Sequence, residues 1–582
     1  MRFRLIVVFC ALVLVALVAA VAANPPWATE EWLQWGQNAQ HAGFVNVVGQ
    51  SPSRELTHVR YDPFVPQEQL DEFGSLAVHY QVPLVDGQGV FMEFKTGTWV
   101  PCSPPSAWLK GTPCGPNTWD QEIWNEKRLV WNDTKLVEKW NFQSDWKPEP
   151  NGHPSGLFGW EPVFHPALSG QFIYVPGFGG TVWKVSQTDG TAISHINPFG
   201  DTVDPNTFVS SPLTADAHGN IYFNVLKLAP ADPWVGNDVV SAWLVKVAPD
   251  DSAAVVTYAT LVPNAPPPDS TKCPGMFFEE KTLPWPPSRK AKPMTELCGS
   301  QRPAVNIAPA VAADGTIYTI SRSHFDALVG YLVAVNPDLT PKWQVSLQKL
   351  LHDGCGFLVP IATKHNQPNA CREGARLGVD PTTNDWGSGW IDDKTTSTPT
   401  VLPDGNILIG VITNYNGGAG HTMKFNPQGH FLGAYEFGFD VTPAVFSHNH
   451  TYSIAIKDNH GGVALYCFYP DNPVCKPLPP GPFDITQLSA DLKPEWKFKS
   501  PTTDKNHPNG FEWCINAPAY DRNGTVYANS EDGNLYVLNQ DGTLKGNIFL
   551  KKAIGAAYTP LSLGPDGKIY TQNDGVMFVV GQ

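Results

Sequence analysis

Residues 524–544, GTVYANSEDGNLYVLNQDGTL, are the stretch that decides the fold. Two strand-like runs, TVYANS and NLYVLNQ, are separated by the tight turn EDG, and a second turn, DG, follows them. Runs rich in β-branched and aromatic residues that are bounded by Asp-Gly predict antiparallel hairpins. The stretch is therefore predicted to be almost entirely hairpin.

The same pattern occurs in eight copies along the chain. The copy from Ala517, APAYDRNGTVYANS, aligns without a gap on APAVAADGTIYTIS from Ala308, TPTVLPDGNILIGV from Thr398 and TPAVFSHNHTYSIA from Thr442. The other four are SPLTADAHGNIYFN from Ser211, TPLSLGPDGKIYTQ from Thr559, HPALSGQFIYVP from His165 and VPLVDGQGVFME from Val82. The shared features are a proline before an apolar strand, a turn with Gly or Asn where a positive φ is needed, and a second strand.

The second half of the unit repeats as well. GNLYVLNQDGTLKG from Gly533 aligns with GYLVAVNPDLTPKW from Gly330, and the closing strand often carries a tryptophan, as at Trp140, Trp343 and Trp496. Four strands in each of eight units predict an all-β fold, an eight-bladed β-propeller of four-stranded antiparallel blades. The chain ends before the eighth unit has a fourth strand, so LTHVRYDPF around Val59 is predicted to pair there and close the ring.

A family resemblance follows from these repeats. The unit P-x-V-x-x-D-G-x-I-Y … G-x-L-x-A-L-N-x-D-G-x-x-x-W resembles the pyrroloquinoline quinone (PQQ) repeat of the quinoprotein-dehydrogenase-like eight-bladed propellers. The stretch WLQWGQNAQHAGF, with Trp32 and Trp35, resembles the lead-in of the same family. The resemblance covers nearly all of the chain after its first residues and implies the eight-bladed propeller fold. It does not imply a quinone cofactor, because many relatives of this fold carry none.

The N-terminus has the layout of a secretory signal peptide. Arg2 and Arg4 precede an uninterrupted apolar run that ends in the small residues Ala20, Val21 and Ala22. We therefore expect a signal peptide over residues 1–23 and a single PQQ-like propeller domain over residues 24–582, in a secreted or periplasmic protein. An uncleaved membrane anchor is the alternative, because the run is about as long as a short membrane span.

The charge of the chain limits its partners. The formal net charge is -15, and removal of a leader with two arginines and no acidic residue makes it -17. An acidic surface of this size argues against nucleic acid or an anionic membrane as a partner. We expect a monomer whose partner is a small molecule, a glycan or a protein.

Eight of the nine cysteines after the leader form four neighbouring pairs. These are Cys102–Cys114, Cys273–Cys298, Cys355–Cys371 and Cys467–Cys475, each in a Pro- or Gly-rich stretch typical of a long loop. In an exported protein such pairs predict local disulfides. Zinc is the alternative, but there is no C-x-x-C spacing, so no metal site is predicted. C-x-x-C-H is also absent, which excludes covalent haem, and Cys514 is left without a role.

The long connections are expected on one face of the propeller. They lie between consecutive units and between the second and third strands within units, and antiparallel strands bring both kinds to the same end. The opposite face is expected to have short turns except near Cys475. Elaborated loops on a rigid scaffold often bind ligands; the alternative is that they only cover the mouth of the channel.

Three of these loops combine tryptophan with carboxylates, which suits stacking and hydrogen bonding to a sugar or another flat polar ligand. The candidate ligand-binding residues are Trp386, Trp390, Asp392, Asp393, Trp160, Glu161, Glu512 and Trp513. The alternative reading is that these tryptophans are buried at blade edges.

The resemblance also implies a dehydrogenase as an alternative function. The alcohol dehydrogenases of the family hold PQQ between a floor tryptophan and a disulfide of two adjacent cysteines, with Ca²⁺ bound by acid and amide side chains beside a catalytic aspartate. This chain has no adjacent cysteines, and no motif for the calcium ligands or the aspartate can be placed on it. Catalytic residues and cofactor therefore remain unassigned. The sequence favours a binding or interaction module over a PQQ- and Ca²⁺-dependent alcohol, aldehyde or sugar dehydrogenase, with a lyase or hydrolase as a third option.

Two further motifs lie on predicted turns. His448 and His450 have ligand-like spacing, but Asn449 stands where other copies have glycine, so a left-handed turn explains them better than a metal. The sequons at Asn132, Asn449 and Asn523 would accept glycans in a eukaryotic secretory route.

Overall fold

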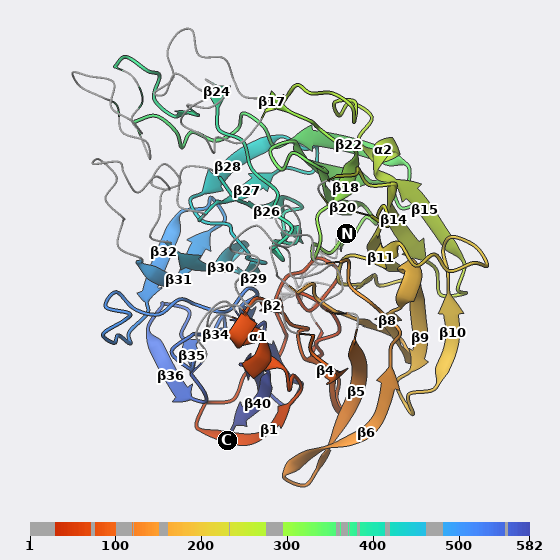
Figure 1. The fold of residues 1–582 in the computed structure, drawn as a ribbon. Helices are drawn as coiled ribbons and strands as arrows, with labels where there is room; N and C mark the ends of the chain where they lie inside the picture. The colour runs from red at the N-terminus through yellow and green to blue at the C-terminus, as the bar shows by residue number, and fades with distance from the viewer. Residues whose placement is uncertain are drawn as a thin grey trace, which may run out of the picture.

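In the computed structural model, eight antiparallel sheets surround a common axis (Figure 1). The structure describes residues 29–71, 76–100, 119, 121–150, 161–231, 233–234, 236–274, 295–356, 361, 371, 373–380, 385–413, 419–460, 481–552 and 557–582. The predicted all-β, eight-bladed propeller is confirmed. The predicted leader, residues 1–23, lies outside the described residues.

The blades follow the eight repeats in order, and each blade is built outward from the axis. Blade 1 has β3 (Leu84–Val85), β4 (Gly89–Gly97), β5 (Glu122–Asn132) and β6 (Lys135–Gln143); blade 2 has β7 (Ala167–Ser169), β8 (Phe172–Pro176), β9 (Val182–Ser186) and β10 (Ala192–Ile196). Blade 3 has β11 (Thr207–Val209), β12 (Thr214–Ala215), β13 (Ile221–Lys227), β14 (Ser241–Val247) and β15 (Ala253–Thr257); blade 4 has β18 (Gln301–Pro303), β19 (Ala310–Val311), β20 (Ile317–Ser323), β21 (Gly330–Val335) and β22 (Pro341–Ser346).

The second half of the ring has the same plan. Blade 5 has β25 (Thr400–Val401), β26 (Ile407–Val411), β27 (His421–Phe425) and β28 (Phe431–Tyr435); blade 6 has β29 (Ala444–His448), β30 (Thr451–Asn459), β31 (Phe483–Ser489) and β32 (Pro494–Lys499). Blade 7 has β33 (Ala519–Tyr520), β34 (Val526–Asn529), β35 (Asn534–Leu538) and β36 (Leu544–Phe549). The opening stretch of the sequence is thus most of blade 7.

Blade 8 is completed by the N-terminal part of the chain. It contains β38 (Ser562–Leu563), β39 (Ile569–Asn573) and β40 (Val576–Gly581), and its outer strand is β1 (Arg54–Arg60). Val59 pairs with Met577 in an antiparallel register, and Figure 1 shows β1 beside β40. The predicted closure is confirmed, and it covers the edge of β40.

The tryptophan of the outer strand joins neighbouring blades. The indole N–H groups of Trp140, Trp343 and Trp496 donate to carbonyl oxygens in the next described blade along the chain, at Gln187 (2.9 Å), Pro427 (3.0 Å) and Gln540 (2.8 Å). In each case a glycine with positive φ lies against the ring, and a Cβ there would come within 2.7–3.0 Å of ring atoms. These glycines are Gly190, Gly429 and Gly542. The repeated Trp and Gly therefore pack against each other and hold neighbouring blades of the propeller together.

The segment of residues 32–50 contacts all eight blades. Its hydrogen bonds join Trp32 to Val85 (2.8 and 2.9 Å), Leu33 to Leu168 (2.8 Å), Gln34 to Ala215 (2.6 and 3.0 Å), Ala39 to Val311 (2.7 Å), Gln40 to Val401 (2.9 Å), Ala42 to Val445 (2.7 Å), Gly43 to Tyr520 (2.9 Å) and Gln50 to Gly567 (2.8 Å). These partners lie in, or directly after, the innermost strand of each blade. We call residues 32–50 the axial segment.

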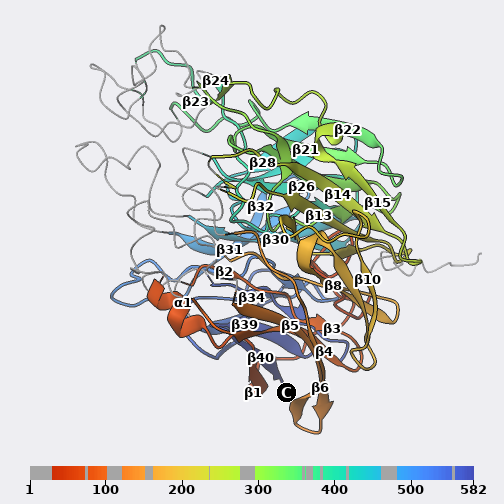
Figure 2. The ribbon, with the colours of Figure 1, turned by 45° about the vertical axis from the view of Figure 1, so that its right-hand side comes forward.

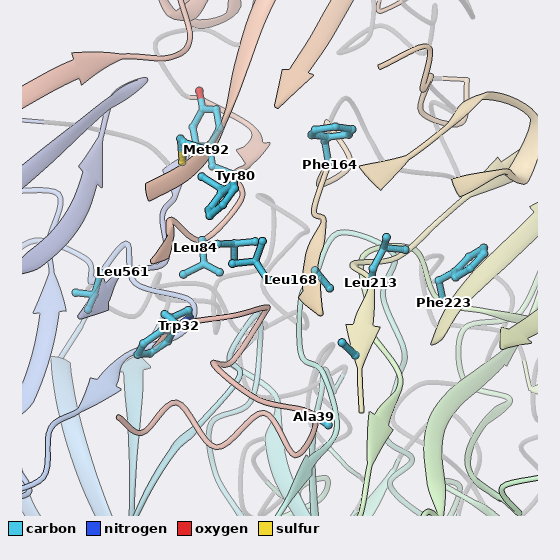
Figure 3. Packing of buried hydrophobic residues seen from close by; sticks show 14 of the residues in the cluster. Trp32, Ala39, Tyr80, Leu84, Met92, Phe164, Leu168, Leu213, Phe223 and Leu561 are labelled. Atoms are coloured by element: carbon cyan, nitrogen blue, oxygen red, sulfur yellow. The ribbon is translucent and has the colours of Figure 1, made fainter. Parts of the chain in front are cut away.

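The axial segment closes one end of the propeller axis. Trp32 and Trp35 are fully buried, and Figure 3 shows Trp32 beside Leu84 of the innermost strand of blade 1. Trp35 donates to Thr442 Oγ1 of blade 6 (3.1 Å) and meets His165, at the start of blade 2, edge to face. The other contacts of the segment are made where the innermost strands enter their turns, so this end is the one that carries the short turns, whereas Trp35 reaches back to residues that precede β29 and β7.

The long connections leave from the opposite end, which we call the loop face; the end with the short turns is the turn face. They follow β4, β13 and β30 within blades, and β6, β15, β22 and β32 between blades. The stretch that contains Cys475, which was expected on the turn face, lies outside the described residues; the strands that flank it, β30 (Thr451–Asn459) and β31 (Phe483–Ser489), meet it at the loop face. The helix α1 (Val65–Asp71) and the small sheet of β23 (Val379–Asp380) and β24 (Asp385–Trp386) lie on this side (Figure 2).

Two of the four predicted disulfides are confirmed. Cys273–Cys298 lies in the connection between blades 3 and 4, where β16 (Cys273–Pro274) pairs with β17 (Thr295–Glu296), and Cys355–Cys371 lies between blades 4 and 5. The pairs Cys102–Cys114 and Cys467–Cys475 lie outside the described residues. Cys514 is a free, buried thiol. Among the described residues no helix is long and apolar enough to cross a membrane.

The turn between β29 and β30 has the predicted left-handed geometry. Asn449 and His450 have φ values of 45° and 62°, as a two-residue hairpin turn of the primed type requires. Asn132, Asn449 and Asn523 are all exposed, which is the accessibility that a glycan acceptor needs.

Candidate functional site

Buried polar side chains gather around the axis at its loop-face end. They lie just before the innermost strands of blades 1, 2, 4, 5, 6 and 7, and each has an exposed fraction of 3% or less: His79, Glu161, Asn306, Thr396, Asp440 and Asn516. We call these six residues the axial belt. Here β2 (Val78–His79) pairs in parallel with β37 (Ala557–Tyr558), and Val78 bridges to Glu161, so backbone from blades 8, 1 and 2 is joined at this level.

Hydrogen bonds and ion pairs connect the belt from blade to blade. His79 N donates to Glu161 O (3.4 Å), and His79 Nε2 lies 3.5 Å from Asp440 Oδ1. Thr396 donates to Asp440 Oδ1 from its backbone N (2.7 Å) and from Oγ1 (2.9 Å). Asn516 Nδ2 donates to Thr396 Oγ1 (3.0 Å). The axis is therefore lined by a rigid, polar network at the loop face.

Asp440 is the ionised centre of this network. Burial alone would raise its pKa, but Lys457 and His79 beside it lower the pKa to about 2. Lys457 Nζ lies 3.4 Å from Asp440 Oδ2, and both side chains are buried. Burial lowers the pKa of Lys457, although Asp440 and Glu512 act in the opposite direction. The pair places a fixed charge of each sign at the mouth of the axis.

A second ion cluster holds the connection before blade 5. Arg302 makes two hydrogen bonds to Asp393, at 2.8 and 2.7 Å, and Arg322 Nη1 lies 3.0 Å from Asp393 Oδ2. Burial disfavours the charge of Asp393, but the two guanidinium groups hold its pKa well below the usual range. Asn306 of the belt donates to Asp393 O (3.3 Å) and accepts from Val163 N (2.9 Å), so this cluster adjoins the belt.

A third cluster surrounds Lys95 at the end of β4. Lys95 Nζ lies 2.7 Å from Glu161 Oε2, 3.0 Å from Asp62 Oδ2, 3.3 Å from Glu68 Oε1 and 4.0 Å from Glu122 Oε2, and all five side chains are buried. Burial raises the pKa of Glu122 to about 9 and that of Glu161 to about 7, with repulsion between the carboxylates adding to it. We call these five residues the Lys95 cluster.

Three of the candidate residues enter these networks. Glu161 belongs to the axial belt and the Lys95 cluster, Asp393 is neutralised by two arginines, and Glu512 acts on the buried Lys457. Burial raises the pKa of Glu512, while Lys457 lowers it. These three residues do not contact one another directly. They are linked through other side chains, such as Lys95 and Lys457, which were not among the candidates from the sequence.

The tryptophans are placed differently from one another. Trp513 is fully buried, packs on Tyr536 with ring centroids 5.2 Å apart, and exchanges backbone hydrogen bonds with the Asn459 side chain (3.0 and 3.1 Å). Trp390 and Asp392 line a narrow pocket that has no room for water. Trp386 is half-buried and stacks on His352 at 3.8 Å. Trp160 lies outside the described residues.

The belt has a sequence signal, although a weak one. Asn306, Thr396 and Asp440 each stand three residues before the proline that opens a repeat. A polar residue three positions before this proline interrupts the apolar sequence that leads into a buried strand. Such a residue indicates a side chain that points toward the axis. Lys95 has no such sequence signal, because it lies near the end of the second strand of its blade and not before a repeat.

The turn face has a cleft of its own. It has a volume of about 780 Å³ and lies between the axial segment and the turns of blades 2 and 3, with Leu33, Gln37, Leu168, Tyr174 and His218 in its lining. This cleft is therefore the alternative candidate for a ligand-binding site, besides the loop face.

No protein-family model and no curated protein matches the sequence. Among solved structures, the chain is similar to a europium-containing methanol dehydrogenase (10% identity, 93% of this chain and 89% of that chain, TM-score 0.49). It is also similar to the quinohemoprotein alcohol dehydrogenase from Comamonas testosteroni (11%, 95% and 81%, TM-score 0.49) and to BamB from Moraxella catarrhalis (10%, 91% and 99%, TM-score 0.38). With these values the likeness says nothing about activity, and the PQQ-repeat-like propeller rests on the repeats and strand pairing of the chain itself.

A pH-dependent prediction follows from Glu149, in the connection between blades 1 and 2. Its side chain is fully buried, neither carboxylate oxygen has a hydrogen-bond partner among the described residues, and burial raises its pKa to about 8. The folded protein keeps this proton while the unfolded chain releases it near pH 4.5, so stability contributed by the neutral form is lost as the pH rises toward 8.

We expect Glu149→Gln to remove this loss. In urea unfolding at pH 5, 7 and 9, the stability of the variant relative to the wild type should grow with pH, by at most about 1.4 kcal/mol per unit, and level off above the folded pKa. The exposed control Glu138→Gln should show a difference that is small and constant. A constant difference for Glu149→Gln would contradict the burial of an unpaired carboxyl here.

Proposed function

We propose that this protein is an exported propeller that binds a hydroxyl-rich ligand, such as a glycan, through its loop face. The observation that carries the proposal is the asymmetry of the axis. At the turn face the axial segment bonds to all eight blades and covers the axis, whereas the loop face carries the long connections, two described disulfides and the charged axial belt. Perturbed charges beneath loops on a rigid scaffold are typical of a binding site.

The ligand class follows from the groups at the loop face. Trp386 offers a half-buried aromatic surface in the connection before blade 5, and the polar, buried belt lies beneath the long connections. Alternating hydrogen-bond donors and acceptors beside an aromatic ring suit a sugar. The acidic surface disfavours polyanions as ligands.

The aspartates around the axis do not fit the calcium site that a quinone dehydrogenase needs. Such a site needs acid and amide oxygens that are free to bind a metal beside a catalytic aspartate. Asp440 already accepts from Thr396 on one oxygen and faces Lys457 on the other, and Asp393 is held by two arginines. Among the described residues the aspartates near the axis are thus neutralised by protein cations, and this favours the binding module.

A binding experiment tests the proposal. Purified mature protein is titrated with chito-, cello- and manno-oligosaccharides, together with the variants Trp386→Ala on the loop face and His218→Ala at the turn-face cleft. We expect Trp386→Ala to weaken binding by roughly tenfold or more, as loss of a stacked aromatic does, and His218→Ala to bind like the wild type. Weakening by His218→Ala alone would place the ligand in the turn-face cleft.

A second experiment separates the proposal from redox catalysis. The protein is incubated with PQQ and Ca²⁺ and tested for dye reduction with a panel of alcohols, aldehydes and sugars. We expect no turnover above a sample without protein. Turnover that depends on both PQQ and the protein would replace the binding module with a dehydrogenase.

A further inference from the structure

The Lys95 cluster has more negative than positive charge. Four buried carboxylates, of Asp62, Glu68, Glu122 and Glu161, surround one ammonium group. A second lysine, Lys147, donates to the backbone carbonyl of Glu122 and thereby brings its charge to the edge of the cluster. With every group ionised, two negative charges are left uncompensated. Uncompensated charge is very costly in a buried site, so the cluster takes up either protons or a cation.

Glu122 supplies an independent sign of a missing partner. Its side chain is fully buried, and neither of its oxygens has a hydrogen-bond donor in the part of the chain that the structure describes. The nearest oxygen is 4.0 Å from Lys95 Nζ, beyond hydrogen-bond distance. One oxygen of Glu68, Oε2, is also buried without a donor. Burial removes the hydrogen bonds of these oxygens to water, and no described residue donates a hydrogen bond to replace them.

The geometry suits a chelated ion. One oxygen from each of Glu68, Glu122 and Glu161 lies within 4.8 Å of the other two. Ca²⁺ binds oxygens at roughly 2.3–2.6 Å, so two oxygens on the same ion are at most about 5 Å apart. The ligand set is made of carboxylates only, which selects a hard cation over zinc or copper.

We propose that Glu68, Glu122 and Glu161 bind one Ca²⁺ ion, which neutralises the Lys95 cluster. Glu68 lies on α1, Glu122 begins β5, and Glu161 lies in the connection to blade 2. The ion would tie the helix on the loop face to blades 1 and 2 and so fix the entrance to the axial belt. This site holds no amide oxygen, does not include Asp393 or Asp440, and does not depend on the proposed glycan binding. No metal site was predicted from the sequence.

The test uses the full mature protein after treatment with EDTA. Calcium chloride is titrated by calorimetry, and Tb³⁺ is used as a luminescent substitute, which Trp124 would sensitise because its indole donates to Glu161. We expect one high-affinity site, with Mg²⁺ binding more weakly because it needs a tighter octahedral set of ligands. Calcium should raise the apparent Tm of the wild type by several degrees.

Two matched variants on the same strand make the test specific. Glu122→Gln should weaken Ca²⁺ binding by roughly tenfold or more and abolish the rise in Tm, while Glu126→Gln should behave like the wild type. Glu126 is also fully buried on β5, but it contacts Gln81 instead of the cluster. In EDTA, Glu122→Gln should be at least as stable as the wild type, because an amide carries no buried charge. This result would also show that the variant folds.

Three outcomes would overturn the proposal. The first is a wild-type protein that does not bind Ca²⁺, and the second is a Glu122→Gln variant that binds it unchanged. The third is equal loss of binding in Glu122→Gln and Glu126→Gln. The first would mean that protons neutralise the cluster instead, and the other two would mean that Ca²⁺ binding does not depend on these three carboxylates.

Discussion

Replacement of Trp35 by alanine is expected to lower the free energy of unfolding by about 3–5 kcal/mol, the range for large aromatic side chains that are deleted from a core. Trp35 is fully buried in the axial segment, and its indole donates to Thr442 of blade 6 while its ring meets His165 at blade 2. The substitution removes a contact between blades on different sides of the ring. It also leaves a cavity that the rigid innermost strands cannot fill. Urea unfolding followed by circular dichroism gives the change.

Trp386→Ala is the matched control for this prediction. Trp386 is half-buried on the loop face, outside the propeller core, so its loss should cost much less than the loss of Trp35. Equal costs for the two variants would mean that the axial segment does not hold the ring together. A cost for Trp35→Ala below about 1 kcal/mol would lead to the same conclusion.

The second large effect is expected at Asp393. Asp393→Asn removes the charge that neutralises Arg302 and Arg322, and both guanidinium groups stay buried. Breaking a buried ion pair from one side typically costs about 3–5 kcal/mol, because the remaining charge is left unpaired. We expect a loss of this size in urea unfolding. Protection of backbone amides from hydrogen exchange should also fall in the connection before blade 5, where Asp393 is anchored to Val305 N.

An exposed ion pair gives the comparison. Glu138 and Lys127 lie 2.6 Å apart on blade 1 with 48% and 22% of their side chains exposed. Glu138→Gln should change stability by less than about 1 kcal/mol, since such pairs are screened by water. If Asp393→Asn were as mild as Glu138→Gln, the two arginines would have other partners, and the cluster would not be a structural anchor.

The blades could be predicted from the sequence because each of them depends on local signals. Proline, an apolar strand, a turn with Gly, Asn or Asp, and a second strand recur in every copy, and the outer tryptophan packs on a glycine of a neighbouring blade. The closing strand around Val59 was predictable for a related reason. A blade with three strands leaves an edge that the rest of the chain must cover.

The axial contacts could not be predicted because they join residues far apart in the chain. His79 and Asp440 meet across the axis only when the ring has closed, and Lys95 and Glu161 are 66 residues apart on neighbouring blades. The sequence did single out Glu161, Asp393 and Glu512, but as candidates to bind a ligand beside tryptophan. In the structure each acts on a buried lysine or arginine, and such partners carry no local pattern.

The position of the described connections followed from strand direction, because antiparallel strands bring the links between blades and the links between second and third strands to the same end. The strands β30 and β31 are the second and third strands of blade 6, so by the same rule the sequence between them begins and ends at the loop face.

The most direct test of the central claim, that the loop face binds the ligand, is a hydrogen-exchange footprint of the protein with the oligosaccharide that binds best in the titrations. We predict slower exchange in residues 385–399 and 436–442, which contain the connection before blade 5 and the approach to Asp440. Residues 166–175 and 215–219 of the turn-face cleft should exchange as in the free protein. Protection confined to that cleft, or no binding of any oligosaccharide, would contradict the account.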